Sequence, residues 1–252
     1  MHKRNKMSDW ADYIFLEQVS STNDFASELL KSGKAKHLQA IRTDFQSAGK
    51  GQKGSSWESE RGKNLLVSII LLPEQMEADK AFFISMAASL AITDALRPLV
   101  PEVKIKWPND IYFRKRKLGG ILIENSIGHG RILSSVTGIG LNINQSRFPD
   151  HLPNPISLAQ ITGKSWPVET IFHSIYDSFR ARVAHLDKNL SGLKKDYTAR
   201  LLGYQKFLDY SAEGEIFRAR LTDVLDTGEI ILEQDSGKIR KYGFKQVRLV
   251  EA

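Results

Sequence analysis

The chain contains no cysteine among its 252 residues. This absence excludes a disulfide framework, a thiol nucleophile and a zinc site with cysteine ligands. A sequence without cysteine suits a reducing compartment, and we therefore expect a cytoplasmic protein.

Long apolar runs are also missing. The longest, Leu65–Leu72, has the length of a strand, whereas a membrane-spanning helix needs about 20 apolar residues. The basic start from Met1 to Met7 is not followed by an apolar segment, so no secretory signal is predicted. Either methionine could be the start, and we expect residues 1–12 to form a disordered tail. No membrane partner is predicted.

The sequence also lacks a recognisable catalytic nucleophile. The patterns G-x-S-x-G and G-x-x-x-x-G-K-[ST] do not occur, and the six histidines are scattered without the spacing of zinc ligands. We predict no metal site in the protein. A reaction whose substrates supply the nucleophile, and in which the protein aligns polyanions, fits this inventory.

The charge balance favours acidic partners. The chain has 36 basic and 29 acidic residues, a formal net charge of +7. Such an excess suits a nucleotide, a nucleic acid or an acidic protein, although a soluble surface rich in lysine explains it equally well. With 41% hydrophobic residues, the chain can bury the core of one large domain, alone or with a small second domain.

Hydrophobic patterns predict an α/β region up to about Gly203. We expect strands at Tyr13–Val19, Leu38–Phe45, Asn64–Leu72, Lys104–Phe113, Leu118–Asn125 and Ile132–Asn144. We expect helices from the capping residues Ser20–Asp24 to near Gly33, over Asp79–Leu96 and Val168–Leu186, and in a further stretch to about Leu202. The basic segment Arg114–Lys117 should join the fourth and fifth strands, and 144–155 should be a long loop.

After Gly203 the pattern changes to short alternating strands. Turn residues at 212–214, 226–228 and 235–237 separate them. We predict a small all-β module, a five-stranded barrel that avoids exposed edges.

The segment Phe45–Trp57 combines glycines with lysines, namely Gly49, Lys50, Gly51, Lys53 and Gly54. Glycine lets a backbone approach a ligand closely and point its N–H groups at an anion. The spacing matches G-x-G-x-x-G, but the dinucleotide fold needs a helix after the third glycine. Residues 55–64 lack an apolar helical stripe and lead into a strand, so that interpretation fails. An ordinary surface loop remains the alternative.

Three further clusters could line a site, and each has a plain alternative. They are Lys106–Asp110 (Lys-Trp-Pro-Asn-Asp), Lys117–Glu124 (Lys-Leu-Gly-Gly-Ile-Leu-Ile-Glu) and Gly138–Asn144 (Gly-Ile-Gly-Leu-Asn-Ile-Asn). The first could be an Asx turn that ends a strand. Lys117 could enter a site or belong to a solvated basic turn. Gly138 and Gly140 clear one face of a strand for a ligand or another backbone, and Asn142 projects from that face.

These four clusters, in this order and after Ser21-Thr22-Asn23, resemble the biotin protein ligases over Ser20–Asn144. The resemblance implies an α/β (α+β) catalytic domain at 1–203, with a mixed sheet like that of class II aminoacyl-tRNA synthetases. It also implies an SH3-like β-barrel at 204–252. The implied reaction joins biotin and ATP, with Mg²⁺, into biotinyl-5′-AMP. The biotinyl group then passes to one lysine of a biotin carboxyl carrier protein domain in a carboxylase such as acetyl-CoA carboxylase.

The resemblance assigns site residues by position. Lys117, Asp110 and Lys50 are implied to be catalytic. Biotin is expected to contact Ser21, Thr22, Asn23, Gln46, Lys50, Gly51, Gln52, Lys117 and Gly120. The nucleotide is expected to contact Gly49, Lys53, Trp57, Asn109 and Asn142. Trp57 and Trp107 could instead be packing walls.

The sequence departs from the family at the glycine loop. The family usually has arginine at position 50 and often at 52, whereas this chain has Lys50 and Gln52. Lysine lacks the bidentate fork of arginine, and glutamine is uncharged. We hypothesise that the loop retains the reactive adenylate less well, although Lys53 could compensate.

Other functions remain alternatives. Some family members carry an N-terminal winged helix-turn-helix and repress biotin genes. Here Ser21-Thr22-Asn23 begins only about twenty residues into the chain, so we expect neither repressor activity nor a nucleic-acid partner. Among enzymes, a lipoyl or octanoyl transferase-type ligase on the related fold is the alternative. The sequence leaves open whether the protein is a monomer or a homodimer.

Overall fold

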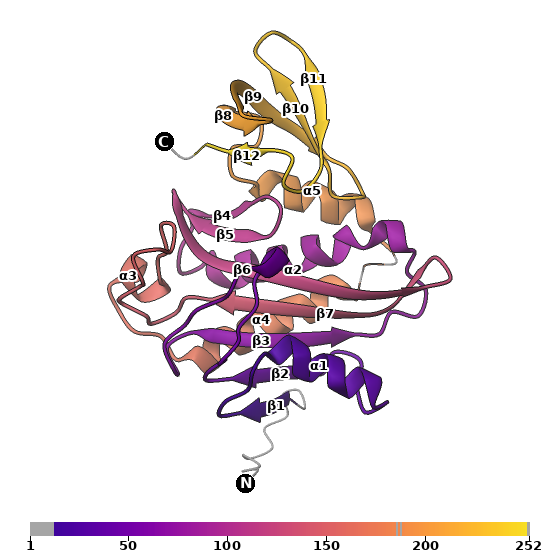
Figure 1. Cartoon of the computed structure of the whole chain (residues 1–252), viewed down its shortest axis with the longest axis vertical. Coiled ribbons are helices and arrows are strands. Elements are labelled where there is room, and N and C mark those ends of the chain that lie inside the picture. Colours follow the sequence, from indigo (N-terminus) through magenta and orange to yellow (C-terminus); the bar gives the residue numbers. More distant parts are fainter. Residues whose placement is uncertain (1–12, 185, 187, 251–252) are drawn as a thin grey trace.

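The structure, a computed structural model, describes residues 13–184, 186 and 188–250. The tail predicted at residues 1–12 lies outside this range. Seven strands form one sheet: β1 (Tyr13–Leu16), β2 (Ala40–Thr43), β3 (Leu65–Leu71), β4 (Val103–Lys106), β5 (Asp110–Phe113), β6 (Arg116–Gly128) and β7 (Arg131–Leu141). Their order is β1-β2-β3-β7-β6-β5-β4. The β1–β2 pair is parallel and the other pairs are antiparallel, which confirms a mixed sheet (Figure 1).

Helices cover both faces of this sheet (Figure 1). They are α1 (Thr22–Lys31), α2 (Phe82–Leu96), α3 (Leu158–Thr162), α4 (Val168–Val183) and α5 (Leu190–Arg200). One face carries α1, which packs over Ile41 and Ile70, and the other carries α2, which packs against α4 and α5. Every residue of β3 is therefore buried, as its nearly uninterrupted apolar sequence predicts. The short helix α3 was not predicted.

The prediction of one strand over Lys104–Phe113 is wrong. This segment is a hairpin of β4 and β5, with a turn at Trp107–Asn109. Proline has no N–H to donate to a neighbouring strand, so a continuous strand cannot form through Pro108. The apolar pattern of the segment did not reveal this break. Tyr197 of α5 donates a hydrogen bond to the carbonyl of Pro108 (3.2 Å), and burial raises the pKa of that tyrosine. The basic link is also shorter than predicted, because Arg116 and Lys117 belong to β6.

The residues after Gly203 form a second, antiparallel sheet. Its strands are β8 (Phe207–Ala212), β9 (Glu215–Val224), β10 (Ile230–Gln234), β11 (Ile239–Tyr242) and β12 (Arg248–Leu249), in the order β11-β10-β9-β8-β12. The antiparallel strands and the turns predicted after Gly203 are therefore confirmed, and closure into a barrel stays a prediction. The sheet lies beside α5 and the β4–β5 hairpin, and Trp107 Nε1 donates to the carbonyl of Gly228 (2.8 Å) (Figure 1). The loop between β9 and β10 thereby contacts the turn that carries Asn109 and leads into Asp110 of β5.

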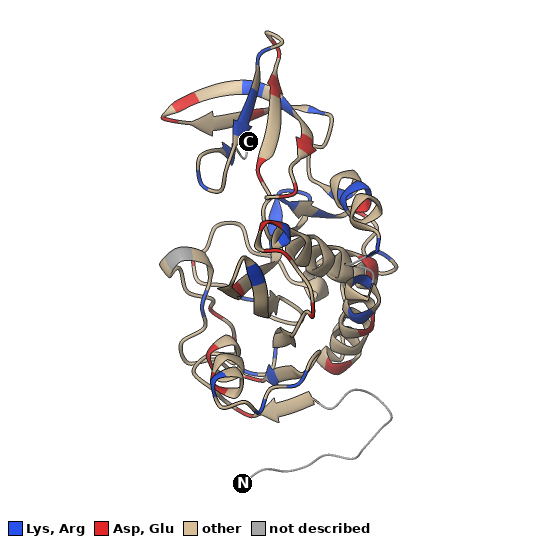
Figure 2. Ribbon diagram, turned by 90° about the vertical axis from the view of Figure 1, so that its right-hand side faces the viewer, with Lys and Arg blue, Asp and Glu red and all other residues tan. Residues whose placement is uncertain are grey.

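Charge is mixed over the molecule. Figure 2 shows basic and acidic residues interspersed along the helices and strands. Among the helices of the described residues, none is long and apolar enough to cross a membrane.

Candidate active site

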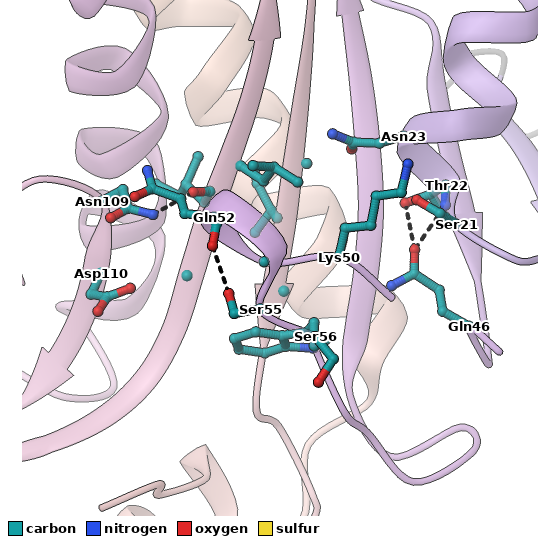
Figure 3. A pocket seen from close by; sticks show the side chains of 18 of the residues that line it. Ser21, Thr22, Asn23, Gln46, Lys50, Gln52, Ser55, Ser56, Asn109 and Asp110 are labelled. Carbon is teal, nitrogen blue, oxygen red and sulfur yellow. Dashed lines mark hydrogen bonds between the residues drawn. The ribbon is translucent and has the colours of Figure 1, made fainter. Parts of the chain in front are cut away.

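A pocket of about 220 Å³ lies on the sheet face that carries α1. It is walled by the start of α1, the glycine loop, the β4–β5 turn and strands β6 and β7 (Figure 3). Twelve residues with predicted roles line it: Ser21, Thr22, Asn23, Gln46, Lys50, Gly51, Gln52, Trp57, Asn109, Asp110, Lys117 and Gly120. Residues from segments far apart in the sequence thus meet in one cavity.

The start of α1 forms one wall. Ser21 is in extended conformation and caps the helix, accepting a hydrogen bond from the Asp24 amide (3.4 Å). The amide of Thr22 donates to Gln46 Oε1 (2.8 Å), and the Thr22 hydroxyl lies 3.0 Å from the same oxygen (Figure 3). Thr22 and Asn23 are each only 3% exposed. These side chains are therefore held by the fold at defined positions.

The glycine loop folds back on itself. Gly51 N donates to the carbonyl of Ser55 (2.7 Å), and Trp57 N donates to that of Gly49 (2.9 Å). Gly54 has φ +85°, a conformation that glycine adopts without strain. The structure agrees that no helix follows the third glycine, as the dinucleotide fold would need. The loop contains a single short 3₁₀ turn, η1 (Gln52–Gly54), and leads into β3.

Glycines form the floor of the pocket. A Cβ on Gly140 would lie 2.5 Å from the indole ring of Trp57, and a Cβ on Gly138 would lie 2.3 Å from Asn23 Oδ1. The nearest atom to a Cβ on Gly120 would be Asp110 Oδ1 at 3.3 Å. Trp57 thus packs against a strip of sheet that lacks side chains, at Gly120 and Gly140.

Two ammonium groups enter the pocket. Lys117 Nζ lies 2.7 Å from Asp110 Oδ1 and 5.8 Å from the centre of the Trp57 ring. Lys50 forms an ion pair with Asp24, and this hydrogen bond raises the pKa of Lys50. Lys50 and Asp110 stand on opposite sides of the cavity (Figure 3). A ligand that spans the cavity would meet one lysine–aspartate ion pair on each side, Lys50–Asp24 and Lys117–Asp110.

Two residues predicted to contact the nucleotide, Gly49 and Asn142, are not among the described residues that line the pocket. Gly49 pairs with Trp57 inside the loop, where a Cβ would lie 2.4 Å from the Trp57 carbonyl oxygen. Asn142 is buried, and its side-chain nitrogen donates to the carbonyl of Ile156 (3.2 Å). The side chain of Lys53 lies outside the described part of the structure. Their nucleotide contacts stay predictions.

The pocket also contains residues that had no assigned role, namely Ser55, Ser56, Val67, Ile121, Leu122, Gly138, Ile139 and Gly140. The alternating glycines at 138 and 140 were a usable signal, because they clear one strand face. Leu122 lies two residues after Gly120 and so shares its face. Nothing in the sequence marks Ser55 or Ser56.

A sequence model of the Biotin/lipoate A/B protein ligase family matches residues 15–144, about half of the chain. The chain belongs to this family. The match spans the end of β1, α1, the glycine loop and strands β2–β7, and it contains every residue that lines the pocket.

Named relatives and solved structures agree with this family. The bifunctional ligase/repressor BirA of Bacillus subtilis is 27% identical over 229 residues, which cover 89% of this chain and 70% of that protein. The biotin--[acetyl-CoA-carboxylase] ligase of Mycobacterium tuberculosis is 28% identical over 200 residues, covering 77% and 73%. The biotin protein ligase of Aquifex aeolicus in complex with biotin and ATP superposes with a TM-score of 0.78 at 23% identity, over 96% of this chain and all of that one. At this identity the superposition shows a shared fold.

Proposed function

We propose that this protein is a biotin protein ligase that makes biotinyl-5′-AMP from biotin and ATP and transfers biotin to a carrier lysine. The observation that carries the proposal is the meeting of Lys117 and Asp110 with the Ser21–Asn23 wall in one pocket. The name of the Mycobacterium tuberculosis relative supports biotin as the substrate and a carboxylase carrier domain as the acceptor.

The proposed reaction needs no protein nucleophile. A biotin carboxylate oxygen attacks the α-phosphorus of ATP, and pyrophosphate leaves. The acceptor amine then attacks the biotinyl carbonyl carbon, and AMP leaves with the bonding electrons. Lys117 stabilises the negative charge where carboxylate and phosphate join, and Asp110 holds its ammonium in place. We propose that Asp110 also helps to position the adenylate or the incoming amine.

Magnesium belongs to this proposal through ATP. Among the described residues, no group of three or more histidine, aspartate or glutamate side chains could hold a metal ion. We propose that Mg²⁺ arrives on the ATP phosphates and neutralises part of their charge.

The finer architecture is part of the proposal. We place the catalytic domain at 1–203 and an SH3-like domain at 204–252, since the second sheet begins at β8 (Phe207–Ala212). The antiparallel strands β3, β7, β6 and β5 beside the pocket support a likeness to class II aminoacyl-tRNA synthetases.

A biotinylation assay tests the function directly. The protein is incubated with ATP, Mg²⁺, biotin and a carrier domain, and the carrier is probed with streptavidin. A signal that requires ATP is expected. A lipoyl or octanoyl ligase, the alternative within the same family, would instead load the carrier with the lipoyl or octanoyl acid and give no streptavidin signal.

The glycine loop yields a further prediction. Gln52 is exposed at the pocket and uncharged, and Lys50 is paired with Asp24, so these two residues offer little free charge to an adenylate phosphate. Gln52→Arg is expected to slow the release of biotinyl-5′-AMP severalfold, because a guanidinium can form a bidentate contact with phosphate. Released adenylate is measured by chromatography in the absence of a carrier. Gln52→Lys, which adds charge without the fork, is the control, and equal release from Gln52→Arg and the natural protein would refute the hypothesis.

A further inference from the structure

Ser68 carries a hydroxyl group in an otherwise apolar strand. It lies in the middle of β3, is 0% exposed, and is the only polar residue in that strand. Burying a hydroxyl costs free energy unless it is hydrogen-bonded. Ser68 Oγ lies 2.6 Å from Asn23 Oδ1 and 2.7 Å from Thr22 Oγ1. The two contacts connect the strand to the wall of the pocket.

The direction of each hydrogen bond follows from Glu124, to which Asn23 is bonded on its other side. Asn23 Nδ2 donates to Glu124 Oε2 of β6 (2.6 Å). An ionised carboxylate can only accept, so the nitrogen of the Asn23 amide must face Glu124 and its oxygen must face Ser68. The single hydroxyl hydrogen of Ser68 is then given to Asn23.

The direction of the hydrogen bond between Thr22 and Ser68 follows from the assignment of Ser68. Because Ser68 has no second hydrogen, the 2.7 Å contact between the two hydroxyls must contain the hydrogen of Thr22. Gln46 Oε1 accepts from the Thr22 amide instead. The result is a directed chain from Thr22 to Ser68, to Asn23 and to Glu124.

This series of hydrogen bonds determines which donor and acceptor atoms Thr22 and Asn23 present to a ligand. Thr22 Oγ1 has a lone pair left to accept, and Asn23 Nδ2 has a second hydrogen left to donate. Both residues line the pocket. A cyclic urea presents the complementary pair, an N–H beside a carbonyl oxygen, whereas a ring without polar hydrogens presents neither.

We propose that Ser68 and Glu124 are positioning residues that set the donor and acceptor polarity of the Thr22–Asn23 wall for the ureido ring of biotin. The proposal rests on the proposed function. Neither residue needs to contact the ligand, since both act through the orientation of Asn23.

A serine-to-alanine pair tests the first residue. Ser68→Ala is expected to raise the dissociation constant for biotin about tenfold, since it removes the donor to Asn23 Oδ1. The KM for ATP and kcat at saturating biotin are expected to change less than twofold. Ser135→Ala is the matched control, because Ser135 on the neighbouring β7 is equally buried and its hydroxyl has no partner within the described residues. Calorimetric titration with biotin and the two KM values are the readouts.

Glu124, the exposed end of this series of hydrogen bonds, provides an independent variant. Glu124→Met removes the acceptor for Asn23 without touching the core, and it is expected to raise the dissociation constant about tenfold. Glu124→Gln retains an acceptor oxygen and is expected to recover most of that loss. This pair decides the question even if Ser68→Ala fails to fold.

The outcomes are separable. If the natural protein does not bind biotin, the proposed function is wrong and this inference is overturned with it. If the natural protein binds biotin and Ser68→Ala and Glu124→Met bind it equally well, the inference alone is wrong. Equal losses in biotin and ATP affinity, or an equal loss in Ser135→Ala, would indicate a general structural role and would also overturn it.

Discussion

Lys117→Ala is expected to lower the rate of biotinyl-adenylate formation by about 10²- to 10³-fold, the usual effect of removing one preorganised charge from a transition state. Lys117 Nζ is the ammonium that Asp110 holds at 2.7 Å, on the strand whose Gly120 forms part of the pocket floor. The negative charge on carboxylate and phosphate would then develop without its counter-charge. Pyrophosphate release in a single turnover measures the adenylation step separately from carrier loading.

Two variants make this result specific. Lys115→Ala removes an exposed lysine from the turn just before β6, and it is expected to leave pyrophosphate release unchanged. Lys117→Arg keeps the positive charge but changes the shape of the charged group. Its rate of pyrophosphate release should lie between the rates of Lys117→Ala and Lys115→Ala. A rate for Lys117→Ala that matches the rate for Lys115→Ala would remove Lys117 from the catalytic role.

The sequence was sufficient for much of the architecture where one physical signal dominated. The continuous apolar run of β3 predicted a strand covered on both faces, and residues such as Ser21 marked the start of α1. Turn residues predicted the hairpins after Gly203. The single strand predicted over Lys104–Phe113 failed because apolar content alone cannot distinguish one strand from a tight hairpin, and Pro108 was the missed signal.

The site shows a different limit. Residues inside a motif, such as Lys117 and Gly120, were found because the motif carries the resemblance. Ser68 could not be found in this way, because its importance lies in contacts with Thr22 and Asn23 that are distant in sequence. Trp57 illustrates the same point, since only the fold shows that its ring lies against Gly140.

Gly138→Ala is expected to weaken biotin binding about a hundredfold. The added Cβ would lie 2.3 Å from Asn23 Oδ1, a distance that real Cβ atoms do not tolerate, and 3.1 Å from Asn23 Cγ. Asn23 must therefore move away from β7, and it cannot do so while bonded to both Ser68 and Glu124. Overpacking costs about 1–3 kcal/mol and a lost hydrogen bond to a charged group about 1.5–3 kcal/mol. These costs add to about 2.5–6 kcal/mol, and a share of about 3 kcal/mol borne by the biotin complex corresponds to about two powers of ten in affinity.

The decisive comparison for Gly138→Ala is with Gly243→Ala. A Cβ on Gly243 would have its nearest neighbour at 3.4 Å, ordinary van der Waals contact, in the loop after β11 and away from the pocket. Titration of both variants with biotin, together with thermal unfolding, separates loss of the site from loss of the fold. Combining Gly138→Ala with Ser68→Ala should cost much less than the product of the single effects, because both act through Asn23. Full additivity would mean that Asn23 does not connect the two positions, and the directed chain of hydrogen bonds would then be wrong.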